Sequence, residues 1–107
     1  MDIRLEMLQS TLVVKIAGEI DHHSAGQIRE TIDSEIERKR VKNLVFDFDR
    51  VTFMDSSGIG VIIGRYKQVR AQGGKTLIIR AKPQVERLLE ISGIKKIIET
   101  NGNDIAL

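Results

Sequence analysis

The sequence predicts an α/β domain whose sheet is mostly parallel and is entered through one antiparallel hairpin. Two short segments with alternating apolar and polar residues stand close together at the start of the chain, which is typical of a hairpin. After them, apolar runs of strand length alternate with segments of helical periodicity, and this order favours parallel neighbours in one sheet. The chain has 107 residues. This length suits one domain with one core, and we expect residues 1–107 to form it.

The hairpin is predicted from residues 3–7 and 12–17, with a turn at residues 9–10. In the first segment every second residue is apolar and the residues between are charged, which indicates a half-buried strand. The second segment is more continuously apolar. Gly18 is expected to end it, because glycine commonly interrupts a strand.

A first helix is predicted after the polar residues 19–24. Asp21 or His22 is expected to cap it, because a polar side chain at this position accepts hydrogen bonds from unpaired N–H groups. The basic residues 38–40 suit the negative end of the helix dipole. The apolar side chains recur at spacings of three and four, and so share one helical face. They are Ala25, Ile28, Ile32 and Ile36.

Two further strand–helix units complete the predicted fold. The strands are expected at residues 44–48 and 76–79, and Pro83 suits the first turn of the last helix. Residues 94–98 are expected to add a short strand or to pack against the body, and residues 101–104 to form a turn. The helix between the two strands has its apolar face at Ile59, Ile62, Ile63, Tyr66 and Val69.

Composition argues against several classes of function. The 17 basic and 15 acidic residues are interspersed, and the net charge is only +2, unlike the basic surface that nucleic acid requires. The chain has no cysteine, so disulfides and cysteine metal sites are excluded. Apolar runs are too short for a membrane span, and charged residues interrupt the start, where a signal peptide would be apolar. We therefore expect a cytoplasmic protein that binds neither nucleic acid nor membrane.

The densest functional signal lies in residues 51–64, between the strand at 44–48 and the helix that follows. Asp55, Ser56 and Ser57 stand at the start of this helix. In open α/β sheets, ligands gather at the carboxyl ends of the strands. Asp and Ser are also the usual capping residues, so capping alone explains part of this pattern.

Three glycines in the same helix, Gly58, Gly60 and Gly64, are not needed for capping. Each costs a helix about 1 kcal/mol relative to alanine. Small residues allow close approach to the backbone, either of a neighbouring helix or of a partner. Their spacing is one residue too long for the dinucleotide fingerprint, and the Gly-Lys-Ser/Thr of a phosphate-binding loop is absent. A small nucleotide-binding domain is therefore a less favoured alternative.

Two other roles of Ser56 follow from its position. A hydrolase would need His22 or His23 as a base within hydrogen-bond reach, but no oxyanion hole is indicated and the Gly-x-Ser-x-Gly pattern is absent. Alternatively, a phosphate on Ser56 would meet unpaired N–H groups and the positive end of the helix dipole. It would add about −1.5 to −2 charges at neutral pH and act as a charge switch on a binding surface.

Residues 53–68 resemble the signature of the anti-sigma factor antagonists of the STAS-domain family. They read Phe-Met-Asp-Ser-Ser-Gly-Ile-Gly-Val-Ile-Ile-Gly-Arg-Tyr-Lys-Gln. Residues 18–23, Gly-Glu-Ile-Asp-His-His, and residues 92–98 are similar to the sporulation-type members of that family. Asp-Ser-Ser-Gly-x-Gly alone marks the broad family, whereas the added Asp-His-His and Gly-Arg-Tyr-Lys-Gln segments make the match specific. The resemblance covers essentially the whole chain.

The resemblance implies a four- to five-stranded, mostly parallel sheet with helices packed mainly on one side. It implies that an anti-sigma factor serine kinase (SpoIIAB-like) phosphorylates Ser56, and that a PP2C-type phosphatase (SpoIIE-like) reverses this. The unphosphorylated chain would bind the kinase and free sigma F for sporulation transcription. ATP and Mg would belong to the kinase, and the chain itself would need no cofactor and catalyse no reaction. An antagonist in a stress-response sigma pathway is the alternative. The implied partner contacts are Asp21, His22, His23, Ser24, Asp55, Ser57, Gly58, Ile59 and Gly60.

Overall fold

The computed structural model describes residues 1–100, which are arranged around a five-stranded sheet of order β1-β2-β3-β4-β5. β1 is antiparallel to β2, whereas the neighbours from β2 to β5 are parallel. The elements are β1 (Asp2–Leu8), β2 (Thr11–Ile20), α1 (Ala25–Arg38), β3 (Asn43–Met54), α2 (Ser56–Arg70), β4 (Thr76–Ile79), α3 (Pro83–Ser92), the 3₁₀ turn η1 (Ile94–Lys96) and β5 (Glu99–Thr100). The predicted α/β class and its hairpin are confirmed.

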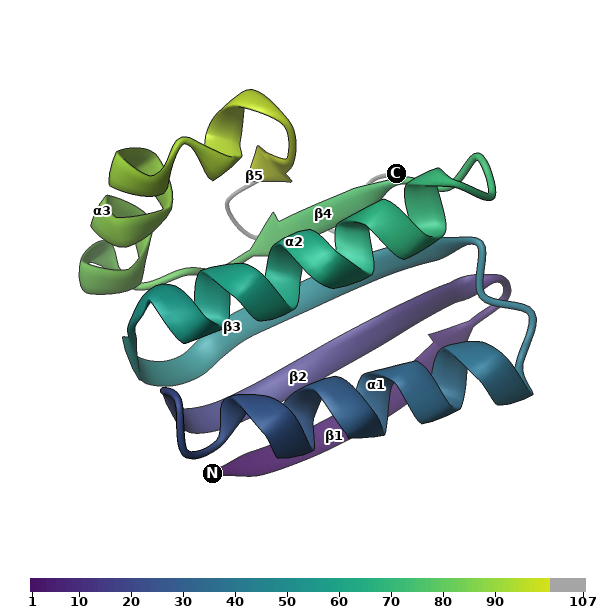
Figure 1. Cartoon of the computed structure of the whole chain (residues 1–107), viewed down its shortest axis with the longest axis horizontal. Helices are drawn as coiled ribbons and strands as arrows, with labels where there is room; N and C mark the ends of the chain where they lie inside the picture. Colours follow the sequence, from purple (N-terminus) through teal and green to yellow (C-terminus); the bar gives the residue numbers. More distant parts are fainter. Residues whose placement is uncertain (101–107) are drawn as a thin grey trace.

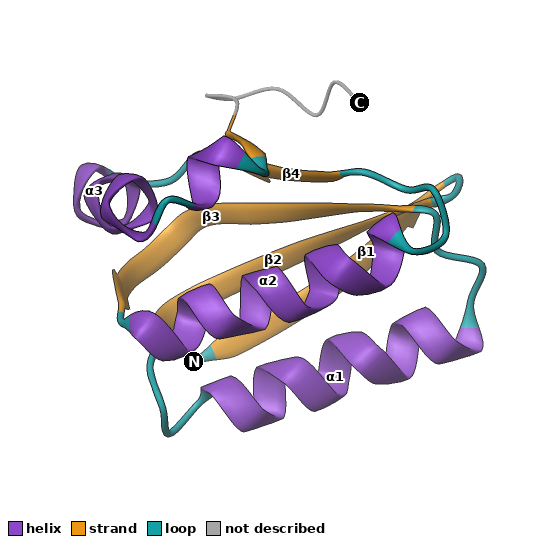
Figure 2. Cartoon of the chain, turned by 45° about the horizontal axis from the view of Figure 1, so that its top comes forward, coloured by secondary structure: helices purple, strands orange, loops and turns teal. Residues whose placement is uncertain are grey.

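The helices pack on one side of the sheet. Figure 2 shows α1 and α2 below the strands on the same face. Buried side chains of all three helices and of η1 join those of β2 and β3 in one core, because apolar residues at helical spacing share one face. The most enclosed side chains of the three helices are Ile28, Ile32, Ile62, Val69 and Leu89. The one-sided arrangement that the family resemblance implied is therefore confirmed.

β2 and β3 are both longer than predicted. Gly18 does not end β2, which continues to Ile20, and β3 runs on from residue 48 to Met54. Gly18 has φ +104° and lies where the register between β2 and β3 shifts, so the glycine marks a bulge rather than an end. A Cβ at Gly18 would also lie 3.1 Å from the Cα of Met1. The continued strands bring the residues that follow them to one edge of the sheet.

Residues 94–98 pack against the body, the second of the two predicted alternatives, and the short strand follows them at Glu99–Thr100. Ile94 and Ile98 are buried in the core, and β5 then pairs with β4, opposite Leu77 and Ile78. The turn expected at residues 101–104 lies outside the described residues. No helix within residues 1–100 is long and apolar enough to cross a membrane.

Candidate functional site

The carboxyl ends of β2 and β3 lie side by side and begin the candidate site. Ile20 pairs with Met54 at the end of both strands, and the Asp55 N–H donates to the Ile20 carbonyl at 3.2 Å. Each strand leads into a helix, α1 from one and α2 from the other, as Figure 1 shows at one end of the sheet. Residues 21–24 and 55–60 therefore start from adjacent positions. Two positive helix ends meet at this edge, which favours an anion there.

Asp55 caps α2 and leaves Ser56 exposed. The Asp55 carboxylate accepts the N–H of Ser57 at 2.8 Å, and the Asp55 carbonyl accepts the N–H of Gly58 at 3.0 Å. Ser56 is the first residue of α2 and its side chain faces solvent, whereas Ser57 is partly buried. The capping contact that the sequence predicts is thus confirmed for Asp55. Of the two neighbouring hydroxyls, that of Ser56 is the more accessible.

The glycines of α2 have different surroundings. A Cβ on Gly58 would lie 2.4 Å from Met54 Cγ and 3.1 Å from Ile20 Cγ2, so only glycine lets the helix start rest on the ends of β2 and β3. A Cβ on Gly60 or Gly64 would meet nothing within 4 Å. A neighbouring helix in the described chain therefore does not explain these two, and the α2 backbone at exposed Gly60 is open to solvent.

The Asp21–Ser24 loop is held in shape by its own side chains. The Asp21 carboxylate accepts the N–H groups of His23 at 3.0 Å and of Ser24 at 3.1 Å. The Ser24 hydroxyl accepts the Asp21 N–H at 3.0 Å and donates to the Glu19 carbonyl at 2.9 Å. The Ser24 N–H in particular holds the pKa of the Asp21 carboxyl below its ordinary value. The N-cap of α1 is Ser24, which makes no side-chain capping bond, so the prediction of Asp21 or His22 as the cap is wrong and the Asp21 carboxylate instead shapes the loop before the helix.

His22 and His23 are the two exposed residues of this loop. Their rings stack on each other with centroids 3.9 Å apart and planes tilted by 38°. Within residues 1–100, no group of three or more His, Cys, Asp or Glu residues has the arrangement of a metal site. The pair instead presents two exposed imidazole rings next to the start of α1.

Two features of the site region were missed at the level of sequence. Phe53 precedes the site on the extended end of β3 and is 46% exposed, so an aromatic ring is accessible there.

Arg65 is 8% exposed and forms an ion pair with Asp33 of α1, with Nε and Oδ1 3.0 Å apart. Burial lowers the pKa of Arg65, and Asp33 opposes that change. The ion pair ties together the two helices whose starts make the site. The sequence does contain a sign that Arg65 is buried, because it stands three residues after Ile62 and four before Val69 and so shares their helical face.

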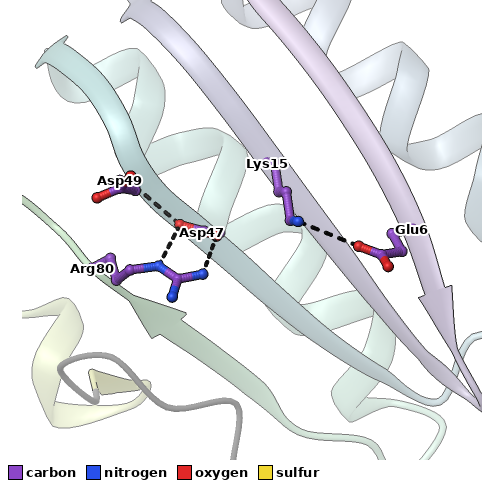
Figure 3. Close-up of polar contacts among 5 residues, drawn as sticks. All are labelled: Glu6, Lys15, Asp47, Asp49 and Arg80. Carbon is purple, nitrogen blue, oxygen red and sulfur yellow. Dashed lines mark hydrogen bonds and ion pairs between the residues drawn. The ribbon is translucent and has the colours of Figure 1, made fainter.

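A second polar region lies on the sheet face opposite α1 and α2. Figure 3 shows Arg80 bound to the carboxylate of Asp47 through Nε at 3.3 Å and Nη2 at 2.6 Å. Burial raises the pKa of Asp47, but hydrogen bonds from Arg80 and the Asp49 N–H outweigh it, and the pKa lies below its ordinary value. Lys15 pairs with Glu6 at 3.3 Å nearby. A groove of about 480 Å³ is lined by Lys15, Asp47, Asp49 and Arg80 together with Asp2, Arg4 and Arg50, and these charges largely neutralise one another.

Comparisons with known proteins agree on one family. The STAS domain model matches residues 2–105. An anti-sigma F factor antagonist of Paenibacillus polymyxa is 37% identical over 105 residues, covering 98% of this chain and 90% of the relative. An anti-sigma-B factor antagonist of Bacillus subtilis (strain 168) is 36% identical over 101 residues, covering 92% and 91%.

Two solved structures of the antagonist SpoIIAA share the fold. The unphosphorylated form superposes with a TM-score of 0.82 at 34% identity, covering 94% of this chain and 88% of the other. The phosphorylated form, described as a Bacillus cell fate determinant, gives a TM-score of 0.74 at 33% identity, covering 94% and 91%.

Proposed function

This chain belongs to the STAS-domain family, and from that premise we propose that it is an anti-sigma factor antagonist whose binding surface is switched by phosphorylation of Ser56. The observation that carries the proposal is the exposed hydroxyl of Ser56 at the first position of α2, beside the capping Asp55. A relative of this kind has been solved in both phosphorylated and unphosphorylated forms.

The surroundings of Ser56 suit a phosphate group that is added and later removed. A phosphate there would lie at the positive end of α2, and the start of α1 is adjacent through the Ile20–Asp55 hydrogen bond. It would also place about two further negative charges next to the Asp55 carboxylate. The phosphate therefore changes the local field strongly, while the capping contacts of Asp55 hold the fold in place.

The proposed partner surface consists of the Asp21–Ser24 loop and the start of α2. Asp21, His22, His23 and Ser24 form one side of it, and Asp55, Ser57 and exposed Gly60 form the other. Gly58 and Ile59 are buried, at 9% exposure for Ile59, so they position the helix start beneath the partner. Without phosphate, this surface binds an anti-sigma factor serine kinase (SpoIIAB-like), which releases its sigma factor.

The reaction chemistry in this proposal belongs to the partners. The kinase supplies ATP and Mg and transfers the phosphate to Ser56, and a PP2C-type phosphatase (SpoIIE-like) removes it. The chain acts in the cytoplasm as a binding module without its own cofactor. We favour the sigma F pathway of sporulation because the relative of 37% identity is an anti-sigma F factor antagonist. The relative of 36% identity favours an anti-sigma-B pathway as the second candidate.

The test is phosphate transfer to matched serine variants. The purified chain is incubated with an anti-sigma F kinase and, separately, with an anti-sigma-B kinase in the presence of Mg-ATP, and phosphopeptides are mapped by mass spectrometry. We expect one phosphate on Ser56, none on Ser56→Ala, and normal transfer to Ser57→Ala. The kinase that reacts faster identifies the pathway. Unchanged transfer to Ser56→Ala would reject the site, and no transfer from either kinase would reject the switch.

A further inference from the structure

The two edges of the sheet differ in length. β5 at one edge has two residues, whereas β1 at the other has seven. β1 pairs with β2 along one side, and among residues 1–100 no strand pairs with its other side. Half of the backbone N–H and C=O groups of β1 therefore point away from the sheet. A strand edge of this length is a template for pairing with a further strand.

The side chains of β1 alternate between two kinds. Ile3, Leu5 and Met7 are half-buried against the core, so part of this apolar row is left uncovered at the edge. Between them, Arg4 and Glu6 point to the opposite face and are exposed. Within the chain, Arg4 Nε lies 3.8 Å from Asp2, and Glu6 forms an ion pair with Lys15 Nζ at 3.3 Å. Both side chains are largely exposed despite these contacts, so each can also meet a charge on a partner strand.

The sequence of β1 complements itself in one antiparallel register. If a twofold axis passes at Leu5, Arg4 of each copy faces Glu6 of the other, and Ile3 faces Met7. Oppositely charged and apolar cross-strand pairs stabilise a sheet, whereas like charges directly opposite destabilise it. Moving the axis to Arg4 would place two arginines opposite each other and Asp2 opposite Glu6. Moving it to Glu6 would oppose two glutamates. Charge therefore selects the register at Leu5.

We infer that β1 is a self-association edge, through which two copies of this chain pair antiparallel with Leu5 on the twofold axis. The two five-stranded sheets then form one continuous sheet. One strand pair makes a small interface, so the dimer is weak and its population depends on concentration. Ser56 follows β3, which β2 separates from this edge, so the pairing leaves the candidate site open and does not depend on its proposed function.

Charge exchange tests the pairing. Sedimentation equilibrium of the full chain from micromolar to millimolar concentration should show a mass that rises from monomer towards dimer. Arg4→Glu and Glu6→Arg should each remain monomeric, because each variant opposes like charges in both cross-pairs. An equimolar mixture of the two should associate again, because every pair is then complementary. Circular dichroism verifies that both variants fold. A monomeric wild-type chain, unaffected single variants or a mixture that stays monomeric would each overturn the inference.

Single cysteines test the register. The chain has no cysteine, so Leu5→Cys introduces one thiol, and in the inferred pairing the two thiols face each other. Directly opposite Cα atoms are about 4.5–5.5 Å apart, within the range of a disulfide. Met7→Cys is the matched control, because two such positions would lie about 13 Å apart along the strands. We expect mild oxidation to link the Leu5→Cys chains and not the Met7→Cys chains. Equal linkage of both variants, or none in Leu5→Cys, would contradict the register.

Discussion

At the start of α2, two adjacent serines have different environments. The N–H of Ser57 is held by the Asp55 carboxylate at 2.8 Å, and its side chain is partly buried. Ser56 lies one position earlier, with its hydroxyl in solvent. A neighbour in a helix is rotated by about 100°, so adjacent hydroxyls meet different surroundings. In the proposed switch, this difference in exposure favours Ser56 over Ser57 as the residue that receives the phosphate.

We predict that Ser56→Asp weakens binding to the anti-sigma kinase at least tenfold, or by about 1.4 kcal/mol. The added carboxylate lies next to Asp55 and changes the charge and shape of the proposed binding surface, while the fold should persist because an acid suits the first turn of a helix. Isothermal titration calorimetry measures the affinity. Ser34→Asp, which adds the same charge on an exposed position of α1, is the control and should bind normally. Equal affinity of Ser56→Asp and the natural chain would refute this prediction.

Sequence reasoning at this scale identified Asp55 as a cap and Ser56 as a candidate because their chemistry is local. The Asp21 contacts were also within reach, because they involve residues two and three positions away. It was harder to predict which side chains lie together at the carboxyl ends of β2 and β3. That depends on β2 running to Ile20 past the Gly18 bulge, and therefore on pairing with a distant strand.

Helix α2 combines tight packing at its start with an open backbone one turn later. Gly58 rests on Met54 and Ile20, whereas a Cβ on Gly60 would meet nothing within 4 Å. The two glycines therefore impose different constraints, although both lower helix propensity. Packing against Met54 and Ile20 requires glycine at position 58, whereas no contact within the described chain requires glycine at position 60.

We predict that Gly58→Ala destabilises the chain by about 1–2 kcal/mol, because overpacking beneath the helix start exceeds the gain in helix propensity. Gly60→Ala should instead stabilise it by about 0.4–1 kcal/mol, because alanine restricts the unfolded chain and fits the open position. Urea denaturation of both variants measures the two free energies of unfolding. A stabilising Gly58→Ala would show that Met54 moves aside without cost.

Most elements could be predicted from the sequence, since their periodicity is clear. The strand at residues 76–79 and the start of α3 at Pro83 agree with the structure. Arg65 was missed because a charged residue on a buried helical face breaks the apolar pattern. Its position is explained only by Asp33 on α1, which neither segment reveals alone. The second half of β3 was missed because exposed charged residues at 49 and 50 interrupt its apolar run.

Across the whole molecule, the sheet is covered by helices on one face and carries the Asp47–Arg80 pair on the other. This pair joins β3 to the end of β4, and Asp47 is only 5% exposed. Burial raises the pKa of Asp47, but the hydrogen bonds from Arg80 and the Asp49 N–H lower it by more, so the folded chain binds this proton less readily than the unfolded chain. Asp47 therefore contributes stability above the ordinary carboxyl pKa of 3.8, and this contribution is lost as the pH falls through the folded value.

We predict that Asp47→Asn lowers the free energy of unfolding by about 1–2 kcal/mol at neutral pH, a value reduced for the partial exposure of Arg80. The difference from the natural chain should shrink below about pH 4, where the unfolded carboxyl becomes protonated. Urea midpoints measured across this range give the comparison. Asp49→Asn, on an exposed neighbour shown in Figure 3, is the control and should change little. A difference that stays constant with pH would contradict this account.

The parallel pairing of β2 with β3 also bears on how the chain folds. Val13 and Val45 are paired neighbours, although they stand 32 positions apart in the sequence, with α1 between them. Closing such a connection costs chain entropy before its contacts form, and non-local pairings of this kind slow folding. The pairing of β2 with β3 also brings residues 21–24 beside residues 55–60. The combined candidate surface therefore depends on this non-local pairing, and a chain in which β2 and β3 are not yet paired would not hold its two halves together.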